Sequence, residues 1–109
     1  MRSLNVAVEV FSRWQENSSA LRVFTPQEED VVSSHDAKVL SVDKLTGIVR
    51  LSFDGGMDAK VLDLSRAILE YVDASEDEQT PEELRREFAG KFLKVRFPRQ
   101  LFVIGELSN

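Results

Sequence analysis

The side chains of this chain with the clearest capacity for chemistry are the basic ones near its C-terminal end. Six lysines and arginines stand between positions 85 and 99, where Glu87 is the only acid: Arg85, Arg86, Lys91, Lys94, Arg96 and Arg99. Alternation along a strand places Lys94 and Arg96 on one face beside an aromatic ring, and Arg99 follows at the next turn. Such cations suit a phosphate or a nucleic-acid backbone. They equally suit the solvent face of a half-buried strand, where charge deters edge pairing.

The single histidine is the only candidate for acid–base catalysis near neutral pH. His35 stands between Ser34 and Asp36, so the residue types of a catalytic triad are adjacent. Neighbours in sequence rarely reach triad geometry, however, and the chain has no Gly-x-Ser-x-Gly nucleophile turn. We therefore predict a solvated loop histidine and a protein that is not an enzyme.

Metal binding would have to use oxygen ligands, because the chain has no cysteine and one histidine. Four carboxylates gather in one stretch: Asp73, Glu76, Asp77 and Glu78. They lack the glycine and the spacing of a calcium-binding loop. We interpret the stretch as a solvated acidic linker, and we predict neither a metal nor a cofactor.

The composition indicates one ordinary globular domain over residues 1–109, with 42% hydrophobic and 30% charged residues. A net charge of −5 disfavours general attraction to nucleic acid or to an anionic membrane. No apolar run approaches the roughly 20 residues that span a bilayer, and the first residues lack the apolar core of a signal peptide. We expect a cytoplasmic protein without membrane insertion.

The first half of the chain has the pattern of short strands. Three valines at alternate positions predict a first strand over residues 5–14, and a short second strand follows at 20–24. Residues 25–30 resemble a helix start, but no apolar helical stripe follows, so an acidic loop is favoured. Residues 36–54 predict a hairpin whose loop ends at Gly47, a residue suited to positive φ.

The second half contains more strands and one predicted helix. Two strand-like stretches meet at Asp63-Leu64-Ser65, and Thr80 followed by proline predicts a short helix over about residues 80–89 that stops at Gly90. Two further strands occupy residues 91–97 and 100–107. The sum is a mainly β protein, a small antiparallel barrel of six or seven strands with one short helix.

The step Asp63-Leu64-Ser65, followed by strand-like stretches at 90–97 and 101–107, resembles the PilZ domain family. Those small β-barrels typically bind cyclic di-GMP and act as bacterial regulatory modules. The resemblance assigns Arg50, Asp63 and Ser65 to a ligand. The family's motif glycine falls at Ile68, and its paired arginines fall at Thr46 and Arg50. Because paired arginines stack on guanine and hold phosphate, the resemblance implies a degenerate domain without an intact cyclic di-GMP motif.

The hairpin of residues 39–43 and 47–51 is also similar to the barrel that precedes the PilZ domain in flagellar brake proteins. That resemblance implies contacts with proteins. Our leading hypothesis is therefore a non-catalytic adaptor that binds a protein partner or forms a homo-oligomer. The alternative is a nucleotide or nucleic-acid binder that uses Lys94, Arg96 and Arg99.

Overall fold

The fold is described from a computed structural model, which defines residues 2–26, 32–56, 59–78, 80 and 82–107. The elements in chain order are α1 (Arg2–Glu16), β1 (Leu21–Pro26), β2 (Val32–Asp43), β3 (Ile48–Phe53), β4 (Ala59–Asp63), the 3₁₀ turn η2 (Leu64–Arg66), β5 (Ile68–Asp73), the 3₁₀ turn η3 (Ala74–Glu76), α2 (Glu82–Arg85), β6 (Phe88–Phe97) and β7 (Gln100–Leu107). No helix among these residues is long and apolar enough to cross a membrane.

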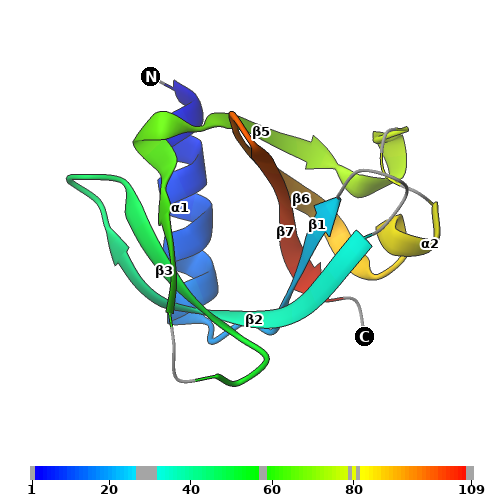
Figure 1. The fold of residues 1–109 in the computed structure, drawn as a ribbon, viewed down its shortest axis with the longest axis horizontal. Helices are drawn as coiled ribbons and strands as arrows, with labels where there is room; N and C mark the ends of the chain where they lie inside the picture. Colours follow the sequence, from blue (N-terminus) through cyan, green and yellow to red (C-terminus); the bar gives the residue numbers. More distant parts are fainter. Residues whose placement is uncertain (1, 27–31, 57–58, 79, 81, 108–109) are drawn as a thin grey trace.

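The described strands form one antiparallel sheet in the order β4-β3-β2-β1-β7-β6-β5. Two meanders, β1 to β4 and β5 to β7, join where β1 pairs with β7. Figure 1 shows the sheet curving around α1. The mainly β class with seven antiparallel strands was predicted correctly.

The sheet is not closed into a barrel, which corrects part of the predicted architecture. Strand direction alternates across an antiparallel sheet, so β4 and β5, at opposite ends of a seven-strand order, run the same way. A parallel pair needs a long crossover, whereas only residues 64–67 separate these two strands. The chain therefore runs from β4 through η2 into β5 end to end, passing near the start of α1 (Figure 1).

The N-terminal segment is a helix, so the predicted first strand over residues 5–14 was wrong. Ala7, Val10, Phe11 and Trp14 are buried at the three- and four-residue spacing of one helix face. Val6 is 40% exposed, so the three valines at alternate positions do not share a face. The buried residues of this segment follow the helical period, and the alternating valines that suggested a strand have no structural role as a set.

The main core lies between α1 and the inner face of the sheet. It includes Val23 from β1, Leu51 from β3 and Ile104 from β7, all completely buried. The indole Nε1 of Trp14 donates to Glu106 Oε1 at 2.9 Å, which satisfies the one polar group of that ring. The helix thus fills the space that the curved sheet encloses.

A second, smaller core covers the outer face of β1, β6 and β7. Its buried members are Phe24, Ala74, Phe88, Phe92 and Val103. The Phe88 ring stands edge-on to the other two phenylalanines at centroid distances of 5.3 and 5.0 Å. These central strands are therefore buried on both faces, with η3 packed against β6.

The predicted elements of the second half are partly corrected. The hairpin of residues 36–54 is confirmed as β2 and β3, and Gly47 has a φ of +78°. The helix predicted over residues 80–89 is shorter, because α2 spans only Glu82–Arg85. Gly90 does not end it; this glycine lies in β6 at a φ of +88°, inside a bulge between Phe88 and Phe92. Of the predicted loop at 25–30, Thr25 and Pro26 belong to β1, and the rest lies outside the described residues.

Candidate functional site

The Asp63-Leu64-Ser65 step at the end of β4 is a turn cap. One carboxylate oxygen of Asp63 accepts from the Ser65 amide at 3.1 Å and from the Ser65 hydroxyl at 2.6 Å. Leu64 between them is buried in the main core, and Arg66 lies 3.5 Å from the other carboxylate oxygen. The polar atoms of the step therefore hold η2 in place.

The same device occurs again at the end of β5. Asp73 accepts from the Ser75 amide at 3.0 Å and from the Ser75 hydroxyl at 2.7 Å, and Ala74 between them is buried. The bond from the Ser75 hydroxyl, then the bond from its amide, lower the pKa of Asp73. Because the motif occurs twice with the same hydrogen bonds, we interpret Asp-x-Ser in this chain as a cap that starts a 3₁₀ turn after a strand.

The residues that the PilZ resemblance assigns to a ligand are only partly together. Asp63 and Ser65 bind each other, whereas Arg50 is exposed on β3 and faces Val61 across the ladder. Within the described chain, no hydrogen bond or ion pair joins Arg50 to either residue. Ile68, at the position of the family's glycine, begins β5 and is 65% exposed.

The basic residues of the second hypothesis do not form one exposed surface. Lys94 Nζ lies 3.0 Å from Asp77 Oδ1, and the two side chains are only 6% and 10% exposed. The Thr80 hydroxyl donates to the second Asp77 oxygen at 2.6 Å. Arg96 and Arg99 are exposed. Lys94 does share a face of its strand with Phe92, but the second core covers that part of the face, so Lys94 is buried and is neither on a solvent face nor open to a phosphate.

His35 lies in β2, so the predicted loop position was wrong. Its ring stacks on Phe53 at a centroid distance of 5.0 Å, and its Nδ1 lies 2.7 Å from Asp54 Oδ2. This contact is the main cause that lowers the pKa of Asp54, with a second bond from the Asp36 amide. Neither partner was predicted, because Phe53 ends β3 and Asp54 follows it, well away from His35 in sequence.

The neighbours of His35 in sequence are bound elsewhere. Arg22 Nη1 donates to the Ser34 hydroxyl at 3.3 Å, and Arg22 Nε lies 2.8 Å from an Asp36 carboxylate oxygen. The side chains of Ser34 and Asp36 thus meet an arginine from β1. The three adjacent residue types do not assemble as a triad.

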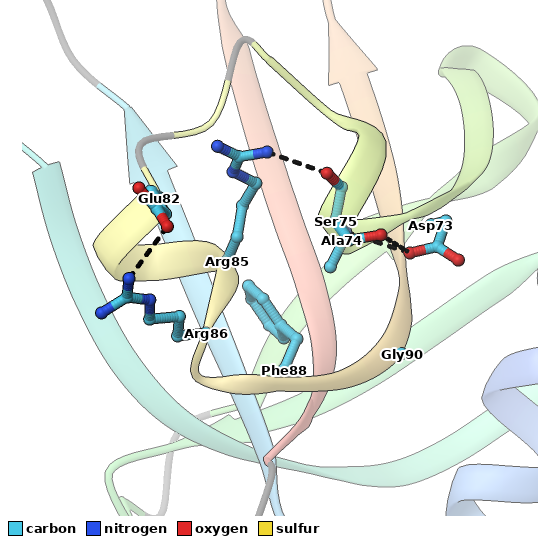
Figure 2. A pocket seen from close by; sticks show the side chains of 8 residues that line it. All are labelled: Asp73, Ala74, Ser75, Glu82, Arg85, Arg86, Phe88 and Gly90. Carbon is cyan, nitrogen blue, oxygen red and sulfur yellow. Dashed lines mark hydrogen bonds and ion pairs between the residues drawn. The ribbon is translucent and has the colours of Figure 1, made fainter.

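A polar pocket of about 430 Å³ adjoins the Asp73 cap, between η3, α2 and β6. Figure 2 shows Arg85 and Arg86 on one side and Ser75 on the other. Arg85 Nη1 donates to the Ser75 carbonyl at 3.0 Å, and Arg86 Nη2 binds Glu82 at 2.9 Å. The two cations of this pocket are therefore engaged with acceptors of the chain itself.

A second hollow of about 510 Å³, which we call the seam cleft, adjoins the Asp63 cap. It is lined by residues of β4 and of the β6–β7 hairpin: Lys60, Val61, Leu62, Asp63, Phe97, Pro98, Arg99, Gln100 and Phe102. Successive strand residues point to opposite faces, so a hollow lined by four in a row lies along the edge of β4. Among the described strands β4 pairs only with β3, so this edge has no partner.

The seam cleft combines aromatic surface with positive charge. The rings of Phe97 and Phe102 meet edge-on at 6.0 Å, and the Lys60 ammonium lies 5.5 Å from the Phe102 centroid. Arg99 is exposed on the opposite wall. In the described part of the chain, neither the Lys60 ammonium nor the Arg99 guanidinium has a carboxylate partner. Val61, on the rim, is 53% exposed.

Of the residues that line the cleft, Asp63 and Arg99 were predicted as site residues, whereas Lys60 and the two phenylalanines were not. A lysine next to valine on a short strand is a weak signal until the strand is known to be an edge. Comparison with protein-family models, curated proteins and solved structures found no match to this chain. The PilZ-like assignment accordingly stays a prediction.

Proposed function

We propose that this chain is a non-catalytic protein-interaction module that binds an extended segment of a partner along the edge of β4. The observation that carries the proposal is the unpaired edge opening onto an apolar cleft. An edge strand offers a row of backbone donors and acceptors that an incoming strand can pair, while pockets beside it select side chains. This is the chemistry of strand addition.

The energetics of such binding are favourable in two ways. Each backbone hydrogen bond adds a net contribution of about 1 kcal/mol, and the short β4 edge can make several. Apolar side chains placed on the half-buried Phe97 and the exposed Val61 add about 25 cal/mol for each Å² that they remove from water. The first contribution requires an extended partner, since a compact ligand would leave the row of backbone groups unpaired.

Lys60 also indicates that the edge is selective. An inward-pointing lysine on an edge strand discourages indiscriminate strand pairing, because a strand that docks there must accommodate the charge. The edge is thus open to a matched segment and resistant to random aggregation.

The nucleic-acid alternative has less support. Lys94 is already paired with Asp77, and the net charge of −5 on the whole chain opposes attraction of a polyanion to Arg96 and Arg99. Calorimetric titration with cyclic di-GMP and with a single-stranded oligonucleotide at low salt checks this alternative. We expect no binding of either.

The proposed function is tested by a photo-crosslinking amino acid placed at Val61, with Ile68 as the matched control. Both residues are exposed aliphatic side chains on strands at the ends of the sheet order, but only Val61 lines the cleft. In cell extract, we expect the probe at Val61 to give a crosslinked peptide, identified by mass spectrometry, that the probe at Ile68 does not give. Crosslinks at Ile68 with none at Val61 would contradict the proposal. Light scattering across concentration checks the predicted self-association separately.

A further inference from the structure

We infer that the seam cleft selects an acidic segment, in which one carboxylate stands beside two apolar residues and meets Lys60. The inference rests on the proposed function and specifies its partner. It follows from the charges of the cleft, from the register of β4 and from what a second copy of the chain would bring to the same edge.

The charge of the cleft favours an anionic partner. Two cations, Lys60 and Arg99, stand on opposite walls without a carboxylate partner in the described part of the chain. The one acid of the lining, Asp63, already accepts two hydrogen bonds from Ser65 and lies beside Arg66. A carboxylate entering over the aromatic floor would meet these cations where water is partly excluded, and this strengthens the attraction.

The register of β4 specifies where that carboxylate belongs. Lys60 faces Leu51 across the ladder, and both Leu51 and Leu62 belong to the main core, so Lys60 and Leu62 share the inner face. Val61 faces outward. A strand added to this edge places one residue opposite each of the three. The matching pattern is a carboxylate opposite Lys60 and apolar residues opposite Val61 and Leu62.

A second copy of the chain is a poorer match to the same edge. If two β4 strands paired about a two-fold axis at Val61, Lys60 of each copy would face Leu62 of the other. The two lysines would then be diagonal neighbours on one face, within reach of each other. Like charges in such positions are destabilising, so the edge favours a partner with acid where this chain has lysine.

Synthetic peptides test the inference on the full chain. The probe is a fluorescein-labelled nine-residue peptide, Gly-Ser-Thr-Val-Val-Glu-Thr-Ser-Gly, which carries the two apolar residues and the acid in antiparallel order. Comparison peptides replace Glu by Gln or by Lys, or replace the second Val by Pro. Fluorescence anisotropy gives the affinity for the natural chain and for Lys60→Gln, Lys60→Glu and Lys44→Glu. Lys44 is an exposed lysine outside the cleft, so its variant matches the net charge of Lys60→Glu.

We expect the Glu peptide to bind about tenfold more tightly than the Gln peptide and to lose roughly the same factor with Lys60→Gln. The Lys peptide should gain affinity on Lys60→Glu but not on Lys44→Glu. Equal binding of the Glu and Gln peptides, or equal losses in Lys60→Glu and Lys44→Glu, would overturn the acidic selectivity and leave strand addition standing. Equal binding of the Pro peptide would instead count against strand addition itself. Failure of the Glu peptide to bind at all would overturn the inference.

Discussion

Two hollows of similar size begin at the same kind of turn, yet the chain treats them differently. The polar pocket adjoins the Asp73 cap, and the seam cleft adjoins the Asp63 cap. In the first, Arg85 and Arg86 bind a carbonyl and a carboxylate of the chain itself. In the second, Lys60 lies over the Phe102 ring, and within the described residues neither Lys60 nor Arg99 pairs with a carboxylate.

The difference shows that arginines in a pocket do not by themselves indicate a binding site, because their charges can already be engaged within the fold. The polar pocket lies among η3, α2 and the start of β6, which we call the outer lobe, and its two arginines bind acceptors of that same lobe. The seam cleft lies where the sheet stays open, because seven strands cannot close on themselves with antiparallel pairs alone. Among the described residues, its backbone edge has no strand partner and its cations meet no carboxylate, so both can bind a partner.

The largest expected effect comes from breaking the lobe beside the polar pocket. Lys94→Ala removes the cation of a nearly buried ion pair. The Asp77 carboxylate, only 10% exposed, then keeps its charge without the Lys94 ammonium beside it. We expect a loss of about 3 kcal/mol in the free energy of unfolding, measured by urea denaturation. The control is Lys38→Ala, which truncates an exposed lysine and should change stability by less than about 0.5 kcal/mol. Equal stability of the two variants would show that the pair does not anchor the lobe.

The next effect comes from the glycine beneath the second core. A Cβ on Gly105 would stand 2.4 Å from the Phe88 ring, so Gly105→Ala must displace an aromatic side chain that two others contact. We expect a loss of about 2 kcal/mol from overpacking, again by urea denaturation. The matched change Gly56→Ala, at a tight turn outside this core, should cost less. A neutral Gly105→Ala would mean that the Phe88 ring packs elsewhere.

On the side of the cleft, the prediction is the reverse: binding changes while stability does not. Val61→Asp places a charge opposite an apolar residue of the peptide, at a position that is already exposed. We expect affinity for the Glu peptide to fall by at least about tenfold, with the free energy of unfolding changed by less than about 0.5 kcal/mol. Ile68→Asp is the control and should leave peptide affinity unchanged. Equal affinity losses in both variants would remove the distinction between the two sheet edges.

The smallest effect concerns the caps and appears only in acid. The hydrogen bonds from Ser75 lower the pKa of Asp73 below its ordinary value of 3.8, so the unfolded chain binds more protons in that range. The stability that Asp73 contributes is present above pH 3.8 and is lost as the pH falls through the lowered pKa. Asp73→Asn cannot titrate, so its urea midpoint should fall less steeply below about pH 4. Parallel curves for the variant and the natural chain would contradict this assignment.

Much of the sheet could be predicted because its signals are local. Alternating apolar residues and Gly47 mark the β2–β3 hairpin, and the two C-terminal strands follow the same rule. The helix α1 was missed because valines at alternate positions coincide with a helical spacing whose buried face includes Phe11 and Trp14. Both periods fit a short segment, and only packing against the sheet decides between them.

The candidate site was less predictable because it depends on pairing between distant segments. Asp63 was recognised as a strand junction, but its role as a cap depends on the conformation of Ser65. Lys60 attracted no attention, since only the strand order reveals that β4 is an edge. Lys94 shares a face with Phe92 as alternation predicts, yet its burial depends on how η3 and Asp77 pack over β6, which the pattern of β6 alone does not indicate.

The most direct test of the account is an amide NMR titration of the natural chain with the Glu peptide. The prediction is that shift changes gather in β4 and in residues 97–102, and that β4 amides exchange more slowly with solvent when the peptide is bound. The amides around the polar pocket, at residues 73–75 and 82–90, should stay unchanged. Changes at the polar pocket with an unaltered β4 edge would contradict the central claim that the open seam of the sheet is the binding site.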